Sequence, residues 1–161
     1  MRLRSYTPAD LDGILDLFYN TVHFVNCRDY SPVQLDAWAP AQLDRAQWAS
    51  SLAAHATWVA ELEGQLVGFT DLDTDDGYLD RLYVHKDYQR CGVATALYRQ
   101  LEQAAQAYGL PRLYTEASLT ARPFFLSQGF RVVREQQKPL RGQLFHNTVM
   151  EKMLEGSPWT A

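Results

Sequence analysis

The segment from Gln89 to Thr95, Gln-Arg-Cys-Gly-Val-Ala-Thr, has the residue types of a loop that binds an anion. A strand-like run, Tyr78 to Val84, precedes it, and apolar residues at helical spacing follow it. Helix starts normally carry a polar cap and acidic residues, because their first N–H groups lack partners and the helix dipole favours negative charge. No acidic residue lies between Asp87 and Glu102, so these N–H groups are expected to remain available to a phosphate.

Gly92 suits this chemistry because it has no Cβ, so a phosphate can approach its main chain closely and the residue can adopt positive φ. Lys86, Arg90 and Arg99 add positive charge nearby, and the small Ala94 keeps the next turn open. The alternative is an ordinary strand-to-helix connection whose polar groups face water. A single glycine loop does not decide between them.

The pattern Gln-x-x-Gly-x-Ala at 89–94, preceded by Leu82-Tyr83-Val84, resembles the acyl-CoA-binding motif of the GCN5-related N-acetyltransferase (GNAT) family. The resemblance extends over nearly the whole chain and includes the Gly129-Phe130 pair. The segments 28–32, 34–40 and 141–143 are most similar to the YafP-type branch of small acetyltransferases.

The resemblance implies acetyl-CoA as the acyl donor. Loop amides would hold its pyrophosphate, and the preceding strand would pair with the pantetheine arm through its main chain. The cofactor-binding residues that follow are Leu82, Tyr83, Val84, Gln89, Arg90, Cys91, Gly92, Val93, Ala94, Thr95, Ser118 and Phe125.

Family members commonly transfer the acetyl group by direct attack of the amine, so positioning supplies much of the rate and Cys91 need not be a nucleophile. The resemblance places the oxyanion donor at the main chain of Tyr83 or Val84, with Val84 preferred. It makes Asp80 the candidate proton acceptor. Alternation along a strand would place Asp80 on one face with Tyr78, Leu82 and Val84. An acid among apolar strand residues is exposed at an edge, paired with Arg81 or Arg131, or held where its pKa rises toward a value useful for catalysis.

Phe125 departs from the family pattern, because many members carry a tyrosine there that protonates the leaving thiolate. Either water takes this role or another hydroxyl does, with Ser118, Tyr83 and Tyr114 as candidates.

By resemblance the acceptor site would contain His23, Tyr30, Trp38 and His146. Tyr30 and Trp38 also fit a packing role, and His146 could simply face outward from its strand. Five acidic residues between positions 71 and 80 could attract a cationic amine or form a solvated turn.

The composition excludes several classes of protein. With 161 residues, 47% apolar and 21% charged, the chain has the size and balance of one folded domain and contains no run long enough to span a membrane. The net charge of −4 and the lack of a basic block argue against nucleic acid as a partner. Two unpatterned cysteines and the absence of a signal peptide favour the cytoplasm. The four histidines show no metal-ligand spacing, so no metal is expected.

Turn signals and periodicity predict a single mixed α/β (α+β) domain at 1–155, with a disordered tail at 156–161. The GNAT fold implied by the resemblance is a central, mostly antiparallel sheet of about seven strands flanked by helices. Expected strands are 2–6, 57–62, 65–71, 78–84, 113–117, 131–140 and 143–153. Expected helices are 7–25, 31–38, 42–54, 93–109 and 120–128.

The resulting hypothesis is an N-acetyltransferase that acts on an amine, either of a small molecule or of a protein, as a monomer or homodimer. The alternatives are an acyl-CoA-binding regulatory or interaction module that has lost catalysis, as Phe125 would allow, and a phosphate-binding protein unrelated to CoA. A nucleoside triphosphate site is disfavoured because the chain lacks the Gly-Lys-Ser/Thr ending of a P-loop.

Overall fold

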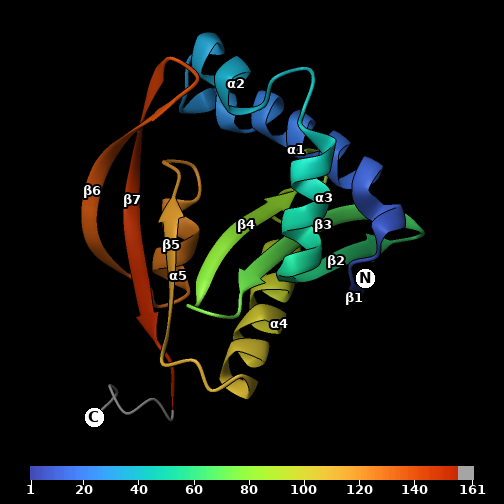
Figure 1. Ribbon diagram of the computed structural model, residues 1–161, viewed down its shortest axis with the longest axis vertical. Coiled ribbons are helices and arrows are strands. Elements are labelled where there is room, and N and C mark those ends of the chain that lie inside the picture. Colours follow the sequence, from blue (N-terminus) through green and yellow to red (C-terminus); the bar gives the residue numbers. More distant parts are fainter. Residues whose placement is uncertain (156–161) are drawn as a thin grey trace.

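A computed structural model describes residues 1–155 as one seven-stranded sheet with helices on both faces (Figure 1). The strand order is β1-β2-β3-β4-β5-β7-β6, and every neighbouring pair is antiparallel except β4 and β5. The strands are β1 Arg2–Ser5, β2 Ala56–Leu62, β3 Gln65–Asp73, β4 Tyr78–Val84, β5 Arg112–Ala117, β6 Arg131–Leu140 and β7 Gln143–Met153. The predicted mixed, mostly antiparallel sheet is confirmed; the predicted tail, 156–161, lies outside the described residues.

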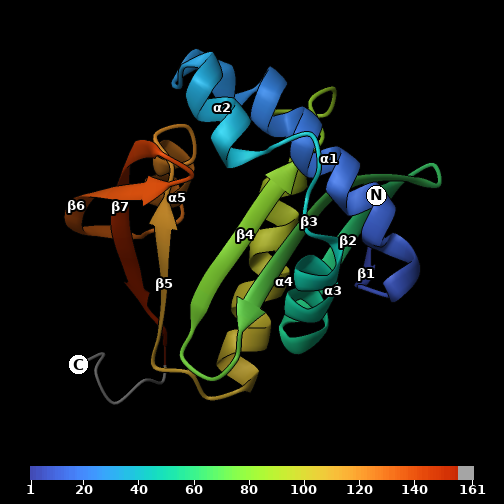
Figure 2. The same ribbon diagram turned by 45° about the horizontal axis from the view of Figure 1, so that its top comes forward.

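The helices are α1 Leu11–Phe24, α2 Pro32–Trp38, α3 Arg45–Ala54, α4 Val93–Ala107 and α5 Arg122–Ser127. Two short 3-10 helices, Pro8–Asp10 and Asn26–Arg28, flank α1. In the turned view α1 and α3 lie in front of the sheet and α4 lies behind it (Figure 2). None of the helices in the described range is long and apolar enough to cross a membrane.

Side-chain caps mark the starts of α2 and α3. Helix α2 begins where the sequence predicts, with a capping box in which Ser31 and Gln34 bond each other's main chain. Helix α3 was expected from position 42 but begins at Arg45, because the Asp44 side chain accepts a hydrogen bond from the Gln47 N–H and caps the helix there.

The core lies in two layers, one on each side of the sheet. The front layer joins α1, α2 and α3 to β2 and β3 through residues such as Ile14, Leu52 and Phe69. The back layer joins α4 and α5 to the sheet through residues such as Tyr98 and Phe125. The two layers hold β4 from both faces, so the strand that carries the predicted site is firmly supported.

Strands β4 and β5 separate along their length. They pair only at Tyr78 and Tyr114, and beyond this point β5 pairs with β7 alone while β4 pairs with β3 alone. The two strands diverge toward α2 in Figure 2. Main-chain groups on this side of β4 therefore have no sheet partner.

Strand β4 has a β-bulge at Asp80. Arg81 pairs with Asp71 and Leu79 pairs with Leu72, so Asp80 is the extra residue. The bulge breaks the alternation on which the expected position of Asp80 depended. Asp80 keeps the face of Tyr78 but faces away from Leu82 and Val84, which pack on the α4 side.

Candidate active site

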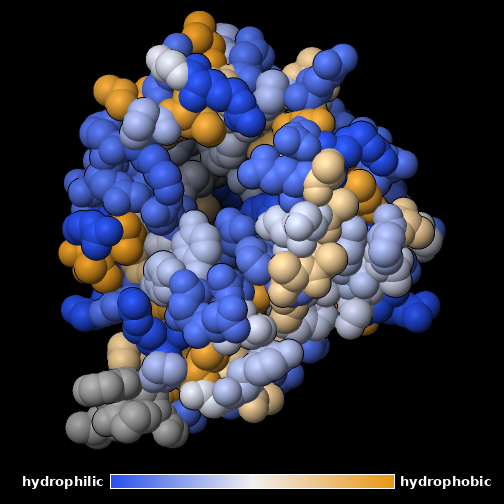
Figure 3. Space-filling model, in the orientation of Figure 1, coloured by the Kyte–Doolittle hydropathy of each residue, from blue (hydrophilic) through white to orange (hydrophobic). Residues whose placement is uncertain are grey.

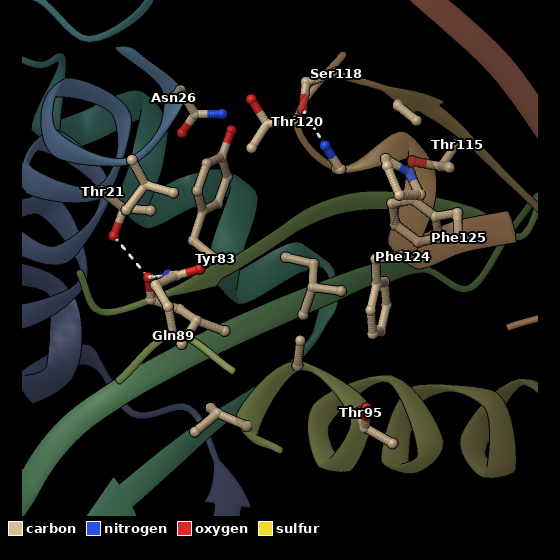
Figure 4. Close-up of a pocket in the computed structure, with 18 of the residues that line it drawn as sticks. Thr21, Asn26, Tyr83, Gln89, Thr95, Thr115, Ser118, Thr120, Phe124 and Phe125 are labelled. Atoms are coloured by element: carbon tan, nitrogen blue, oxygen red, sulfur yellow. Dashed lines mark hydrogen bonds between the residues drawn. The ribbon is translucent and has the colours of Figure 1, made fainter. Parts of the chain in front are cut away.

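A cavity of about 470 Å³ lies where β4 and β5 separate. Its walls come from α1 and the turn after it, β4, the first turn of α4, the end of β5 and the β5–α5 connection. The space-filling view has a hollow at this place, below α2 (Figure 3). Figure 4 shows Thr95 on α4, Phe124 and Phe125 on α5, and Thr21 and Asn26 on the opposite wall. The sheet opening is therefore a site reached by side chains from several elements.

The first turn of α4 faces this cavity with free donors. Gly92 is the N-cap, with φ of 82°, no capping side chain and no acidic residue in the first turn. Within residues 1–155 no acceptor binds the main-chain N–H groups of Gly92, Val93, Ala94 or Thr95. A Cβ at Gly92 would meet nothing within 4 Å, so the space outside the glycine is open. The arrangement is that of an anion site at a helix N-terminus.

Gly68 on β3 brings α4 close to the sheet. A Cβ at this position would lie 2.8 Å from Val93 Cγ1 and 2.9 Å from Leu97 Cδ1. The missing side chain thus lets the first turn of α4 rest on the sheet, which positions the loop.

The carbonyl of Val84 is held from two sides. Thr21 Oγ1 donates to it at 2.9 Å and Gln89 Nε2 at 2.7 Å. The neighbouring His85 N–H donates to Val67 on β3, so alternation turns the N–H groups of Val84 and Leu82 toward the unpaired gap. The end of β4 therefore presents main-chain N–H donors to the cavity.

Asp80 lines the same cavity and its side chain is 31% exposed. Burial, together with the charge of Asp71, raises the pKa of the Asp80 carboxyl. Arg81 Nη2 lies 3.4 Å away and His55 Nδ1 lies 3.8 Å away, and both oppose this rise. Of the three alternatives for Asp80, the structure shows two together, pairing with Arg81 and a raised pKa, whereas Arg131 binds Glu151.

Asp71 holds the groups around Asp80. It is fully buried and accepts hydrogen bonds from Arg81 Nε at 3.2 Å, Arg81 Nη2 at 2.7 Å and His55 Nδ1 at 2.8 Å. Arg81 also stacks over the Trp48 ring at 4.6 Å and donates to Ser51.

His55, Asp71 and Asp80 bring three potential metal-ligand atoms within 4.8 Å of one another, but the guanidinium already occupies both Asp71 oxygens. We interpret the group as an ion-pair network, and the absence of a metal stays a prediction.

The three residues considered as proton donors to the leaving thiolate, Ser118, Tyr83 and Tyr114, differ in position. Tyr83 and Ser118 line the cavity, whereas Tyr114 does not, and its hydroxyl donates to Asp76 at 2.7 Å. Burial raises the pKa of Tyr83, which keeps its hydroxyl protonated. Ser118 Oγ accepts the Ala121 N–H at 3.1 Å, so its own hydrogen remains free to donate.

The predicted cofactor residues largely gather on one wall. Those that line the cavity are Leu82, Tyr83, Val84, Gln89, Arg90, Gly92, Val93, Ala94, Thr95, Ser118 and Phe125. Cys91 does not; it is exposed, and its Sγ lies 3.4 Å from the Gln89 carbonyl.

Of the four predicted acceptor residues only Trp38 lines the cavity. Tyr30 is buried beside it, and its hydroxyl accepts the Leu119 N–H at 2.9 Å. His23 binds the Ala39 carbonyl at 2.8 Å, and His146 lies on β7 beside Glu135 at 3.7 Å. The structure therefore does not bring His23 and His146 into the cavity.

Sequence reasoning missed several lining residues. Asn26 is only 5% exposed, and its carboxamide makes no hydrogen bond within the part of the chain that the structure describes. Thr21, Glu116 and Thr120 also line the cavity. They come from separate elements and share no spacing, so no sequence signal could have grouped them.

Comparison with known proteins identifies the family. The family model described as "Acetyltransferase (GNAT) domain" matches residues 26–152. The chain belongs to the GNAT acetyltransferase family. It is therefore an acyltransferase.

Two relatives are similar over nearly their whole length. The "Uncharacterized N-acetyltransferase YafP" of Escherichia coli K12 is 36% identical over 150 residues, which cover 93% of this chain and 94% of that protein. A GCN5-related N-acetyltransferase from Rhodopseudomonas palustris, whose description adds "Aminotransferase, Class-II", has a TM-score of 0.91 at 36% identity, covering 95% of each chain. The first of these matches confirms the expected likeness to YafP.

A more distant match shows the fold alone. The PaiA N-acetyltransferase of Thermoplasma acidophilum, solved in complex with coenzyme A, has a TM-score of 0.78 at 16% identity, covering 94% of this chain and 98% of that one.

Proposed function

We propose that this GNAT enzyme transfers the acetyl group of acetyl-CoA to the amine of a small molecule, by direct attack of the amine on the thioester. The observation that carries the proposal is the set of free N–H groups at the start of α4, which opens onto the unpaired edge of β4. The coenzyme A in the Thermoplasma PaiA structure supports CoA as the carrier in this fold.

The donor would bind along the wall formed by the loop and β4. The pyrophosphate is assigned to the N–H groups of residues 92–95, in a first turn of α4 that has no acidic residue. The pantetheine arm is assigned to the edge of β4, where the N–H groups of Leu82 and Val84 have no sheet partner. This arrangement would bring the thioester to the end of β4.

The acceptor would enter from the face of β4 that carries Asp80. Asp80 is assigned as the proton acceptor because it borders the cavity and its raised pKa brings it closer to that of a useful base. The amine nitrogen bonds to the carbonyl carbon, its proton passes to Asp80 directly or through water, and the thiolate leaves. The N–H of Val84 is assigned to the developing oxyanion, since it faces the gap while Thr21 and Gln89 hold the carbonyl of the same residue.

A small acceptor is favoured by the walls of the cavity. The free carboxamide of Asn26 offers a donor and an acceptor to the cavity, and the Glu116 carboxylate, which binds Lys138 at 2.7 Å, adds a negative charge that acts on Asp80. Such groups can orient a compact polar amine. A protein amine is the alternative acceptor, and it would leave part of its chain outside the cavity.

The test is a screen of acetyl-CoA against mixed small amines and amino-terminal peptides, with detection of the free thiol. Acceptor-dependent thiol release that is strongest with small amines supports the proposal. Release with peptides only would move the acceptor to proteins.

Phe125 supports one other reading, an acyl-CoA-binding module that has lost catalysis. The residue is buried against Phe124 and Phe130, and its ring has no ionisable proton to return to the thiolate. Tight CoA binding without turnover across the whole panel would favour this module.

A further inference from the structure

His55 lies between the cavity and the protein surface. It directly follows α3, and its side chain is 16% exposed. Its Nδ1 is 2.8 Å from Asp71 Oδ2 and 3.8 Å from Asp80 Oδ2, while its Nε2 is 4.0 Å from Asp73 Oδ2. One edge of the ring thus faces the candidate base, and the other faces a half-exposed carboxylate.

Among His55, Asp71, Asp80 and Arg81 the charges balance only when His55 is protonated, and Asp73 adds a further negative charge on the Nε2 side. Asp71 and Asp80 contribute two negative charges, and Arg81 contributes one positive charge. Asp71 uses both oxygens on Arg81 and one of them on His55 as well, so little of the guanidinium charge is left to balance Asp80. A charged imidazole supplies the missing positive charge at 3.8 Å from Asp80.

We propose that His55 is a positioning residue of the acetyl transfer: its positive charge, anchored by Asp71, keeps the Asp80 carboxylate ionised and ready to accept a proton. This rests on the role of Asp80 in the proposed function. His55 itself lies outside the cavity wall and need not touch either substrate.

The groups facing His55 account for this role. From β3 they are Asp71 and Asp73, and from β4 they are Asp80 and Arg81. The hydrogen bond to Asp71 raises the pKa of His55, and Arg81 opposes it. Glu116 on β5 affects the cluster through Asp80, whose pKa its charge raises.

In such a coupled pair, the protonation state of each group changes the pKa of the other. When His55 loses its proton, Asp80 loses a stabilising charge and becomes a stronger base; when Asp80 gains a proton, His55 releases its own more readily. Protons then leave the pair in two steps that belong to both residues. Because Nε2 points away from Asp80, His55 can release its proton on the solvent side while Asp80 accepts one inside the cavity.

The test is a carbon-13 NMR titration of the aspartate carboxyls and histidine rings in the full chain, without donor or acceptor. In the wild type we expect the Asp80 and His55 signals to share the same two midpoints. In His55→Asn the side-chain amide can still donate to Asp71 but carries no charge, and the Asp80 midpoint should rise by about one pH unit. His146→Asn is the control, since that histidine faces Glu135, and the Asp80 curve should not move.

Independent single transitions in the wild type, or an unmoved Asp80 midpoint in a folded His55→Asn protein, would overturn the proposal. The wild-type titration decides the matter if the variant does not fold. No acetyl transfer is measured, so a failure of the proposed function would appear in the amine screen and not here.

Discussion

The substitution Gly92→Glu tests the anion site, and Gly109→Glu is its matched control. Both glycines have positive φ, 82° and 74°, and in both a Cβ would meet nothing within 4 Å. Each substitution therefore adds the same backbone strain, about 1–2 kcal/mol, without a clash. They differ in place, because Gly92 begins α4 and Gly109 follows its end, about 25 Å away at 1.5 Å per residue.

The expected loss of affinity follows from charge. A carboxylate about 6 Å from a diphosphate, at an effective dielectric constant of about 40, opposes binding by roughly 1.4 kcal/mol for each unit of charge. Two units of charge give about 2.8 kcal/mol, which corresponds to about a hundredfold loss of CoA affinity. Salt screening weakens the repulsion, so the expected loss of affinity is tenfold or more. A charge at Gly109 lies beyond the Debye length of about 8 Å and should change CoA affinity less than twofold.

The assay is calorimetric titration of CoA into both variants, with thermal unfolding as the check on folding. An acidic residue at the start of a helix is favoured by the dipole, so Gly92→Glu should be no less stable than Gly109→Glu. Equal CoA affinity in two folded variants would refute the anion site.

Three further predictions concern the base, the loop and the charge network. Asp80→Asn should lower kcat by about 10²–10⁴ with CoA affinity within twofold of wild type, and an unaltered pH–rate profile would remove Asp80 from the mechanism. Gly68→Ala would force Val93 and Leu97 apart from β3, so it should lower the free energy of unfolding by about 1–3 kcal/mol in urea and weaken CoA binding; a fully stable variant would contradict this packing. His55 and Asp80 both have raised pKa values in the folded state, so the folded protein binds more protons than the unfolded one. The stability from His55 is present below its unfolded pKa of about 6.5 and is lost as the pH rises through its higher folded pKa. The free energy of unfolding should therefore fall over this window in wild type and fall less in His55→Asn, as urea titrations at each pH would measure.

The elements with strong local signals were predictable from the sequence. The strand Tyr78–Val84, the start of α4 at Val93 and the final hairpin, Arg131–Leu140 with Gln143–Met153, have the predicted bounds. Each is framed by turn residues or by a change in periodicity, which act over a few neighbouring positions. The confirmed fold follows from these local patterns together with the family resemblance.

Features that depend on pairing across strands were not predictable. The bulge that turns Asp80 away from Leu82 exists only in the register between β3 and β4. The contact of His55 with Asp71 joins residues with no common spacing, and it forms because α3 ends beside β3. The cavity-facing carboxamide of Asn26 likewise depends on where the turn after α1 meets the gap. Tertiary placement decides these features, and local sequence does not report it.

The central claim is that the free N–H groups at the start of α4 bind the pyrophosphate of the acyl donor. A crystal structure with CoA bound tests this most directly. The account predicts pyrophosphate oxygens within hydrogen-bonding distance of the N–H groups of residues 92–95, with the pantetheine arm along the edge of β4 at Leu82 and Val84. Coenzyme A bound elsewhere, with those N–H groups contacting only water or protein, would contradict it.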